Sequence, residues 1–266
     1  MAECLYIFDN LEEISRKIKS SEKILLGMDH DGTIAEVITT LIASRITELM
    51  RNILYSLSQN PRIHLAIISG RTIDSLKEVV NIKSDNIFYA GNHGFEIEGA
   101  GINYTFNDKD ALEKIRVITE EMDKKFSNVD GLVFEKKIFT TSFIWSTVTP
   151  EKQESIRNEI LEALQKYKSI RIVEGKKLFN IRPDVYINKG IAVSIIGNHF
   201  YEDNWRKQVT TIYIGDDNSD EDAFKILEEK DIGIVVNKSP PEDTNAGYYL
   251  KSVKEVEDFL KLVNEI

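Results

Sequence analysis

Residues 24–33 decide how the rest of the chain is interpreted; they read Ile24-Leu25-Leu26-Gly27-Met28-Asp29-His30-Asp31-Gly32-Thr33. The apolar run up to Met28 predicts a buried strand, and two aspartates follow where that strand ends. Because side chains alternate along a strand, Asp29 and Asp31 share a face, and His30 points away and is given no catalytic role. Two such close carboxylates repel each other unless a proton or a cation such as Mg²⁺ separates them. Taken alone, the stretch fits an acidic turn as well as a metal site.

The length, charge and cysteine content of the chain argue against several classes of protein. The 266 residues allow one large or two small domains, and 42% hydrophobic residues suffice for a core. A net charge of −10 argues against a general nucleic-acid or anionic-membrane binder. Cys4 is the single cysteine, which fits a reducing compartment, and no apolar run has the length of a membrane span. The first ten residues lack the basic start of a signal peptide. We therefore expect a cytoplasmic protein with no nucleic-acid or membrane partner.

The first part of the chain alternates strands and helices. Apolar periodicity predicts helices over residues 11–20, 46–58 and 73–80, strands over 24–28, 63–68 and 87–90, and a hairpin over 96–106. This order predicts right-handed crossovers and a Rossmann-like parallel sheet with helices on both faces, an α/β fold.

The pattern changes at Lys109. Helices are predicted over 111–126 and 150–167, and strands over 131–137, 138–149, 170–174 and 178–182. This α-β-β-α-β-β order indicates a compact α+β insert. The predicted domains are residues 1–108 for the first part of the core, 109–182 for the inserted cap and 183–266 for the second part of the core.

The second part of the core carries another acidic strand end. A helix is predicted over 191–198 after Asn188-Lys189-Gly190, and strands over 211–214 and 232–236, with a last helix over 253–263. Residues 215–222 read Gly-Asp-Asp-Asn-Ser-Asp-Glu-Asp. A short helix is predicted over 223–227. Acids favour a helix start, but Asp216 and Asp217 precede this helix, where metal ligation explains them better.

Four strand ends or helix starts therefore carry polar groups: Asp29-x-Asp31, Ser69-Gly70-Arg71, Lys189, and Asp216-Asp217. Ligands of open α/β sheets bind at the carboxyl ends of the strands. A carboxylate nucleophile, a second carboxylate that moves a proton, and a lysine with Mg²⁺ are the parts of phosphoryl transfer. No Gly-x-x-x-x-Gly-Lys-Ser/Thr loop is present, which argues against a P-loop NTPase.

With these motifs the chain resembles the haloacid dehalogenase-like (HAD) phosphatases, and within them the trehalose-6-phosphate phosphatases. The matching segments are Asp29–Thr33, Ser69–Arg71, Gly91–Gly94, Glu174–Lys177, Ile181–Pro183, Lys189-Gly190 and Gly215–Phe224. The resemblance implies an HAD core with an α+β cap and a Mg²⁺-dependent phosphatase that acts on a small phosphorylated sugar. We expect a monomer or a weak dimer.

The resemblance also implies roles for individual residues. Asp29 is the expected nucleophile and Asp31 the general acid and base. The expected phosphate-binding residues are Gly32, Ser69, Gly70 and Lys189. The expected metal ligands are Asp29, Asp31 through its carbonyl, Asp216, and Asp217 or Asp220. The candidate substrate contacts are Arg71, His93, Glu135, Lys137, Glu174, Lys176, Asn180 and Arg182, although His93 fits a buried structural histidine equally well.

Two cap positions depart from the family pattern. Asn180 stands where the family usually has glutamate, and Ile144-Trp145-Ser146 stands where it often has His-Tyr-Arg. Trehalose 6-phosphate is the expected substrate, and a glucosyl- or mannosyl-phosphoglycerate is the alternative. A catalytically silent binding module and a sugar-phosphate mutase are the alternatives of other classes.

Overall fold

The structure is a computed structural model that describes residues 3–37, 44–175 and 177–266. It divides into two compact units, a core of Met1–Thr105 with Ile187–Ile266 and a cap of Phe106–Tyr186. Lys176, one of the candidate substrate contacts, lies outside the described residues. Among the described helices, none has both the length and the apolar character needed to cross a membrane.

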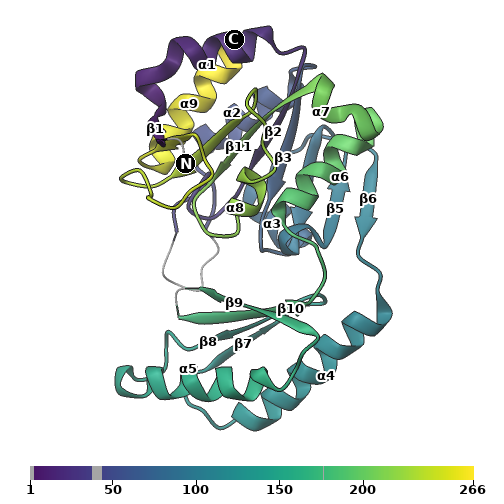
Figure 1. The fold of residues 1–266 in the computed structure, drawn as a ribbon, viewed down its shortest axis with the longest axis vertical. Helices are drawn as coiled ribbons and strands as arrows, with labels where there is room; N and C mark the ends of the chain where they lie inside the picture. Colours follow the sequence, from purple (N-terminus) through teal and green to yellow (C-terminus); the bar gives the residue numbers. More distant parts are fainter. Residues whose placement is uncertain (1–2, 38–43, 176) are drawn as a thin grey trace. The chain divides into compact units, whose positions relative to one another are not determined.

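The core is built on a mostly parallel sheet that has nine strands among the described residues (Figure 1). The strands are β1 (Leu5–Tyr6), β2 (Lys23–Met28), β3 (Ile63–Ile68), β4 (Ile87–Gly91), β5 (Glu96–Gly99), β6 (Ile102–Thr105), β11 (Val209–Gly215), β12 (Ile232–Val236) and β13 (Tyr248–Leu250). Their order is β1-β13-β12-β11-β2-β3-β4-β5-β6, and only the pairs β4–β5 and β5–β6 are antiparallel. This arrangement confirms the predicted α/β class.

Helices cover both faces of the core sheet. They are α1 (Leu11–Ser20), α2 (Glu48–Gln59), α3 (Ile73–Val80), α6 (Lys189–Tyr201), α7 (Trp205–Gln208), α8 (Glu221–Phe224) and α9 (Val253–Glu265), with short 3-10 turns at Ile7–Asn10, Asn92–Gly94 and Glu202–Asn204. Because successive side chains of β2 point to opposite faces, Leu26 packs in the cluster with α1, α2, α3 and α9, whereas Leu25 packs in the cluster with α6, α7 and α8. Trp205 in this second cluster lies against Gly197, where a Cβ would approach Trp205 Cδ2 to 2.4 Å.

The cap is a two-layer α+β unit. It comprises α4 (Lys109–Phe126), β7 (Val133–Lys136), β8 (Thr141–Ile144), α5 (Pro150–Gln165), β9 (Ile170–Gly175) and β10 (Leu178–Pro183). The strands form an antiparallel sheet in the order β7-β8-β10-β9, and α4 and α5 pack on one of its faces (Figure 1). Phe143 and Phe179 are buried in that layer, and Trp145 packs against Phe179 with ring centroids 4.8 Å apart.

The register of the cap strands defines a second, helix-free face. Since Phe143 and Phe179 face the helices, Ser142 and Asn180 beside them point the other way. Ser142 lies opposite both Glu135 and Asn180, so these three side chains form one row across β7, β8 and β10. We call this side of the sheet the helix-free face.

Two cap strands are shorter than predicted, and the strand predicted over 131–137 covers Val133–Lys136. The predicted strand over 138–149 is reduced to Thr141–Ile144. Its later apolar residues Trp145 and Val148 are buried in a turn, in which Val148 N donates to Trp145 O at 3.2 Å. The apolar residues of this turn are explained by burial, and they do not indicate an extended strand.

The core holds elements that the sequence did not predict. The two-residue strand β1 pairs with β13, with Leu5 opposite Tyr248, and α7 is a single turn. The predicted helix over 223–227 is also a single turn, Glu221–Phe224. Such short elements carry too few residues for a periodic signal.

Candidate active site

Three of the predicted site segments of the core follow neighbouring strands. Met28 at the end of β2 lies opposite Ile214 of β11 on one side and Ile67 of β3 on the other. Asp29 continues the β2–β11 pairing because its N–H donates to Ile214 O at 2.9 Å. The segments that begin at Asp29, Ser69 and Gly215 therefore meet at one edge of the sheet.

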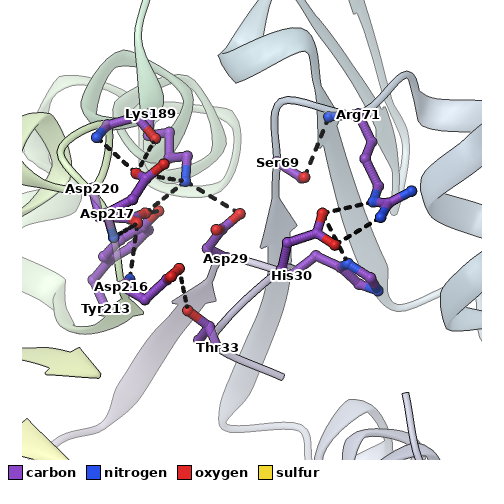
Figure 2. Close-up of polar contacts among 12 residues, drawn as sticks. Asp29, His30, Thr33, Ser69, Arg71, Lys189, Tyr213, Asp216, Asp217 and Asp220 are labelled. Atoms are coloured by element: carbon purple, nitrogen blue, oxygen red, sulfur yellow. Dashed lines mark hydrogen bonds and ion pairs between the residues drawn. The ribbon is translucent and has the colours of Figure 1, made fainter. Parts of the chain in front are cut away.

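Lys189 is the centre of a buried network at this edge (Figure 2). It is the first residue of α6, and the side chain of the preceding Asn188 caps that helix by accepting from Ile191 N at 2.9 Å. Only 1% of the Lys189 side chain is exposed; its Nζ lies 2.7 Å from Asp220 Oδ1 and 3.2 Å from Asp29 Oδ1. A buried ammonium is stable there because it is paired with carboxylates.

Asp220 fixes both Lys189 and the loop after β11. The hydroxyl of the buried Tyr213 donates to Asp220 Oδ1 at 2.7 Å. The backbone N–H groups of Asp216 and Asp217 donate to its other oxygen at 3.0 and 3.1 Å. A Cβ at Gly215 would lie 2.1 Å from Asp220 Cγ, so glycine is needed for this close approach. Both oxygens of Asp220 are engaged by the protein.

Asp216 lies across from the turn that follows Asp31. Thr33 Oγ1 donates to Asp216 Oδ1 at 3.3 Å. Gly32 has φ +85, and a Cβ there would lie 2.0 Å from Asp216 Oδ2. Glycine is therefore required at position 32 by both the backbone angle and the contact with the Asp216 carboxylate.

The electrostatics of this cluster favour an additional cation. Four acids, Asp29, Asp216, Asp217 and Asp220, surround the one lysine. Burial and the neighbouring acids raise the pKa of Asp29 well above its usual value although Lys189 opposes them, and they raise that of Asp216 to about 7. Burial would lower the pKa of Lys189, but Asp220, Asp29 and Asp217 outweigh it and keep the ammonium charged.

The donor set suits a hard metal ion. One carboxylate oxygen from each of Asp29, Asp216 and Asp220 lies within 4.8 Å of the others. Because the protein already engages both Asp220 oxygens, Asp29 and Asp216 are the better direct ligands. Asp217 is turned toward its own loop: its Oδ1 accepts from Ser219 N and Oγ at 2.7 and 2.6 Å, and its side chain is 58% exposed.

Asp31 has a different partner from Asp29. Arg71 Nε donates to Asp31 Oδ2 and Nη2 to Oδ1, both at 2.7 Å. The buried His30 ring, which was given no role, places Nδ1 3.4 Å from Asp31 Oδ2. Burial acts to raise the pKa of Asp31, but His30 and Arg71 outweigh it and hold the pKa well below its usual range.

The segment after β3 forms a loop tied to the end of β4. Ser69 is buried, its N–H donates to Ala90 O at 2.9 Å, and its carbonyl accepts from His93 N at 2.9 Å. His93 has φ +58 and packs on Gly70, where a Cβ would lie 2.7 Å from His93 Nε2. His93 thus has a structural contact next to the proposed phosphate-binding segment.

The candidate substrate contacts of the cap fall into two sets. Glu135, Asn180 and Arg182 belong to the helix-free face by register, and Asn180 Nδ2 donates to Ser142 Oγ at 3.0 Å. Lys137 Nζ lies 3.4 Å from Glu135 Oε1. Glu174 instead accepts two hydrogen bonds, at 2.7 and 2.8 Å, from Arg157 of α5 on the helix-covered side.

Two polar residues of the core site were not predicted from the sequence, Tyr213 and Thr33. Tyr213 was read as part of an apolar strand. A tyrosine inside a fully buried strand needs a hydrogen-bond partner for its hydroxyl, and that requirement is the signal that could have marked it. Thr33 directly follows the acidic turn, and only the fold brings Asp216 to it.

Comparisons with known proteins identify related sequences. The trehalose-phosphatase family model matches residues 27–254. Trehalose-phosphate phosphatase B of Arabidopsis thaliana is 29% identical over 273 residues, covering 98% of this chain and 70% of that protein. The probable trehalose-phosphate phosphatase E of the same plant is 32% identical over 266 residues, covering 96% and 73%.

Solved structures agree on the fold. The C-terminal domain of C. albicans trehalose-6-phosphate phosphatase superposes with a TM-score of 0.79 at 19% identity, covering 100% of this chain and 99% of that one. The predicted fold, a parallel-sheet α/β core with an inserted α+β cap, is thereby confirmed. The family model spans the acidic turn after β2, the loop after β3, the start of α6 and the acidic loop after β11, and on this match the chain belongs to the trehalose-phosphatase family.

Proposed function

We propose that this protein hydrolyses trehalose 6-phosphate to trehalose and phosphate, with Mg²⁺, through an aspartyl-phosphate on Asp29. Membership of the trehalose-phosphatase family makes the chain a phosphoric monoester hydrolase. The observation that carries the mechanism is the buried network in which Lys189 touches Asp29 and Asp220, at the strand end next to Asp216.

In the proposed first step, an Asp29 oxygen attacks phosphorus and the bond from phosphorus to the sugar oxygen breaks. Because His30 and Arg71 keep Asp31 ionised before substrate binds, Asp31 first takes the proton of the bound phosphate ester and then gives it to the departing sugar oxygen. In the second step, water attacks the phosphorus, gives a proton to Asp31, and the bond from phosphorus to Asp29 breaks. Asp31 passes that proton to the departing phosphate, so both acids return to their ionised starting states, and the products are the sugar and inorganic phosphate.

The surrounding groups bind and neutralise the phosphoryl group. Lys189 lies 3.2 Å from Asp29 Oδ1, so its charge is next to the proposed attacking group. Ser69 and Gly70, with Gly32, are the proposed phosphate-binding residues. Asp29 and Asp216, with the Asp31 carbonyl, are the proposed Mg²⁺ ligands, and Asp220 supports them. When bound, the ion supplies positive charge that offsets the charge of the transferring group and of the four acids.

The cap residues are proposed to select the sugar. Glu135, Lys137, Asn180 and Arg182 offer hydrogen-bonding groups of the kinds that bind sugar hydroxyls. Asn180 is the residue in this set that departs from the family pattern, so it is the first position to test for selectivity. A cytoplasmic location, based on Cys4 as the single cysteine, and a monomeric or weakly dimeric state stay predictions.

A phosphate-release assay over several phosphate esters tests the proposal. It compares trehalose 6-phosphate with glucose 6-phosphate, glucosyl- and mannosyl-phosphoglycerate, and p-nitrophenyl phosphate, each with Mg²⁺ or with EDTA. We expect the highest kcat/KM for trehalose 6-phosphate and loss of turnover with EDTA. A clear preference for a phosphoglycerate ester would overturn the proposed substrate but not the proposed mechanism of phosphate release. No EDTA-sensitive turnover of any ester would favour the silent binding module.

A further inference from the structure

The two aspartates of the strand end are held by different cations. Asp29 contacts Lys189, which belongs to the network with Asp220 and Tyr213. Asp31 is paired with Arg71, whose Nη2 lies 2.7 Å from Asp31 Oδ1. Figure 2 shows Asp29 and Lys189 on one side of the site and His30 and Arg71 on the other.

The contact between Arg71 and Asp31 is a two-point contact. Two N–H groups of one guanidinium bind the two oxygens of the carboxylate at 2.7 Å each. Such a fork fixes the plane of the carboxylate as well as its position. The Asp31 side chain is still 34% exposed, so the remaining lone pairs of its oxygens are accessible.

The backbone of Arg71 is itself fixed in place. Its N–H donates to Ser69 Oγ at 3.3 Å, and its carbonyl accepts from Asn92 N at 2.7 Å. Asn92 Nδ2 and Ile73 N both donate to Glu96 Oε1, at 2.8 and 2.9 Å. The guanidinium therefore extends from a loop that is anchored to the end of β4 and to β5.

We propose that Arg71 is a positioning residue for proton transfer by Asp31, and not a ligand of the substrate phosphate. One donor pair of the Arg71 guanidinium, the N–H groups of Nε and Nη2, is occupied by Asp31. By fixing the plane of the Asp31 carboxyl, Arg71 directs its open lone-pair positions, which carry the proton in the first step and accept one in the second, toward the leaving oxygen and then toward water. This inference rests on the proposed mechanism but not on which sugar is the substrate.

The test uses two substrates whose leaving groups differ in their need for a proton. An alkyl phosphate such as trehalose 6-phosphate leaves as a strongly basic alkoxide, whereas p-nitrophenolate leaves readily without a proton. In Arg71→Met we expect kcat for the best sugar phosphate to fall roughly 10²-fold, within the range of general acid–base catalysis, with KM nearly unchanged. The rate of the first release of p-nitrophenol, measured by rapid mixing, should fall far less.

Three further variants make the test specific. Arg71→Lys keeps the charge but not the fork, and we expect it to recover little of the lost kcat. In an Asp31→Asn background, Arg71→Met should cause no further loss, because Arg71 acts through Asp31. Arg45→Met, which removes an exposed arginine bound to Glu78 at 2.9 Å in the same unit, should leave both substrates unaffected.

Other outcomes would overturn the proposal. A raised KM with an unchanged kcat would make Arg71 a substrate ligand. Equal losses of the first step on both substrates, or a further loss in the Asp31→Asn background, would show that Arg71 does not act through proton transfer. A wild-type protein that prefers another sugar phosphate overturns only the proposed substrate, whereas one that turns over no phosphate ester overturns both proposals.

Discussion

The core and the cap hold their polar residues in different ways. In the core, the single side chain of Asp220 accepts hydrogen bonds from Lys189, from Tyr213 and from the backbone of two further acids. Most of these groups are buried. In the cap, Glu135 is exposed and pairs with Lys137, two residues along the chain. A change in the core network therefore leaves several buried groups without a partner, whereas a change on the helix-free face affects one contact at a time.

The ion pairs of the two units show the same difference. Lys189 and Asp220 are almost inaccessible to water, whereas Arg157 and Glu174 of the cap are 34% and 48% exposed. Water and salt screen an exposed pair, but a buried charge that loses its partner cannot be solvated. This difference predicts that substitutions in the core network strongly reduce activity or stability, whereas substitutions in the cap have small effects. Four experiments test this prediction.

Loss of the nucleophile should have the largest effect. Asn is nearly the same size as Asp but does not attack phosphorus, so Asp29→Asn should lower phosphate release by roughly 10⁴-fold or more. The variant should fold, because the carboxamide removes a buried charge without leaving a cavity. Steady-state assays, with circular dichroism as the folding control, measure both. Retention of a tenth of the wild-type rate would contradict the aspartyl-phosphate mechanism.

Removal of the buried lysine should affect stability and catalysis together. Lys189→Met leaves Asp29 and Asp220 buried without their cation, and should lower the free energy of unfolding by roughly 3–5 kcal/mol. It should also lower kcat roughly 10²- to 10³-fold, as expected for loss of one charge at the reacting group.

Arg157→Met is the matched control in the cap, since it also removes a cation paired with a carboxylate. Urea unfolding should show no resolvable change for it, because that pair is solvent-exposed. If the two variants lost equal stability, the contrast between the units would be wrong.

The binding of Mg²⁺ should depend on pH through Asp216. Its pKa of about 7 lies above the ordinary 3.8, so the unfolded chain ionises first and the metal-free protein should lose stability as pH rises from about 4 toward 7. Mg²⁺ binds the ionised form, so its apparent affinity should rise roughly tenfold from pH 6 to pH 8. Calorimetric titration measures the affinity, and Asp216→Asn should weaken the dependence to the part that Asp29 contributes. A flat profile would show that Asp216 does not exchange its proton for the metal.

The smallest effect is expected on the helix-free face of the cap. Asn180→Ala should lower kcat/KM for the preferred sugar phosphate by roughly fivefold to tenfold, the loss of about one hydrogen bond. Turnover of p-nitrophenyl phosphate should stay within about twofold of wild type, because that ester lacks the sugar hydroxyls such a hydrogen bond would serve. Glu174→Gln, on the helix-covered side, is the matched control. Equal losses on both esters would mean that Asn180 supports the fold and does not select the sugar.

Much of the fold follows from local patterns. The strands Ile63–Ile68 and Ile232–Val236 and the helix Ile73–Val80 have the bounds that their apolar runs predict. The strand Leu5–Tyr6 could not be predicted in this way, because it exists only through its pairing with Tyr248 and Tyr249. Such short edge strands form because of tertiary contacts, and local sequence patterns do not specify them.

The sequence predicted which residue types form the core site, but it did not predict which of these residues contact one another. Two acids at one strand end indicate a cation, and alternation places them on one face. That Asp29 contacts Lys189 while Asp31 contacts Arg71 depends on how each side chain turns beyond the strand. Residues 40 and 160 positions away in the sequence supply the partners, and no local pattern specifies them.

The two tryptophans of the chain are divided between the units, Trp145 against Phe179 in the cap and Trp205 against Gly197 in the core. Each indole is buried, so its emission changes when its own unit unfolds and exposes it to water. A Trp145→Phe protein therefore reports on the core by fluorescence alone, and a Trp205→Phe protein on the cap. The molecule thus has one built-in optical probe for each unit, which lets the folding of the catalytic part and of the selective part be followed separately and without a label.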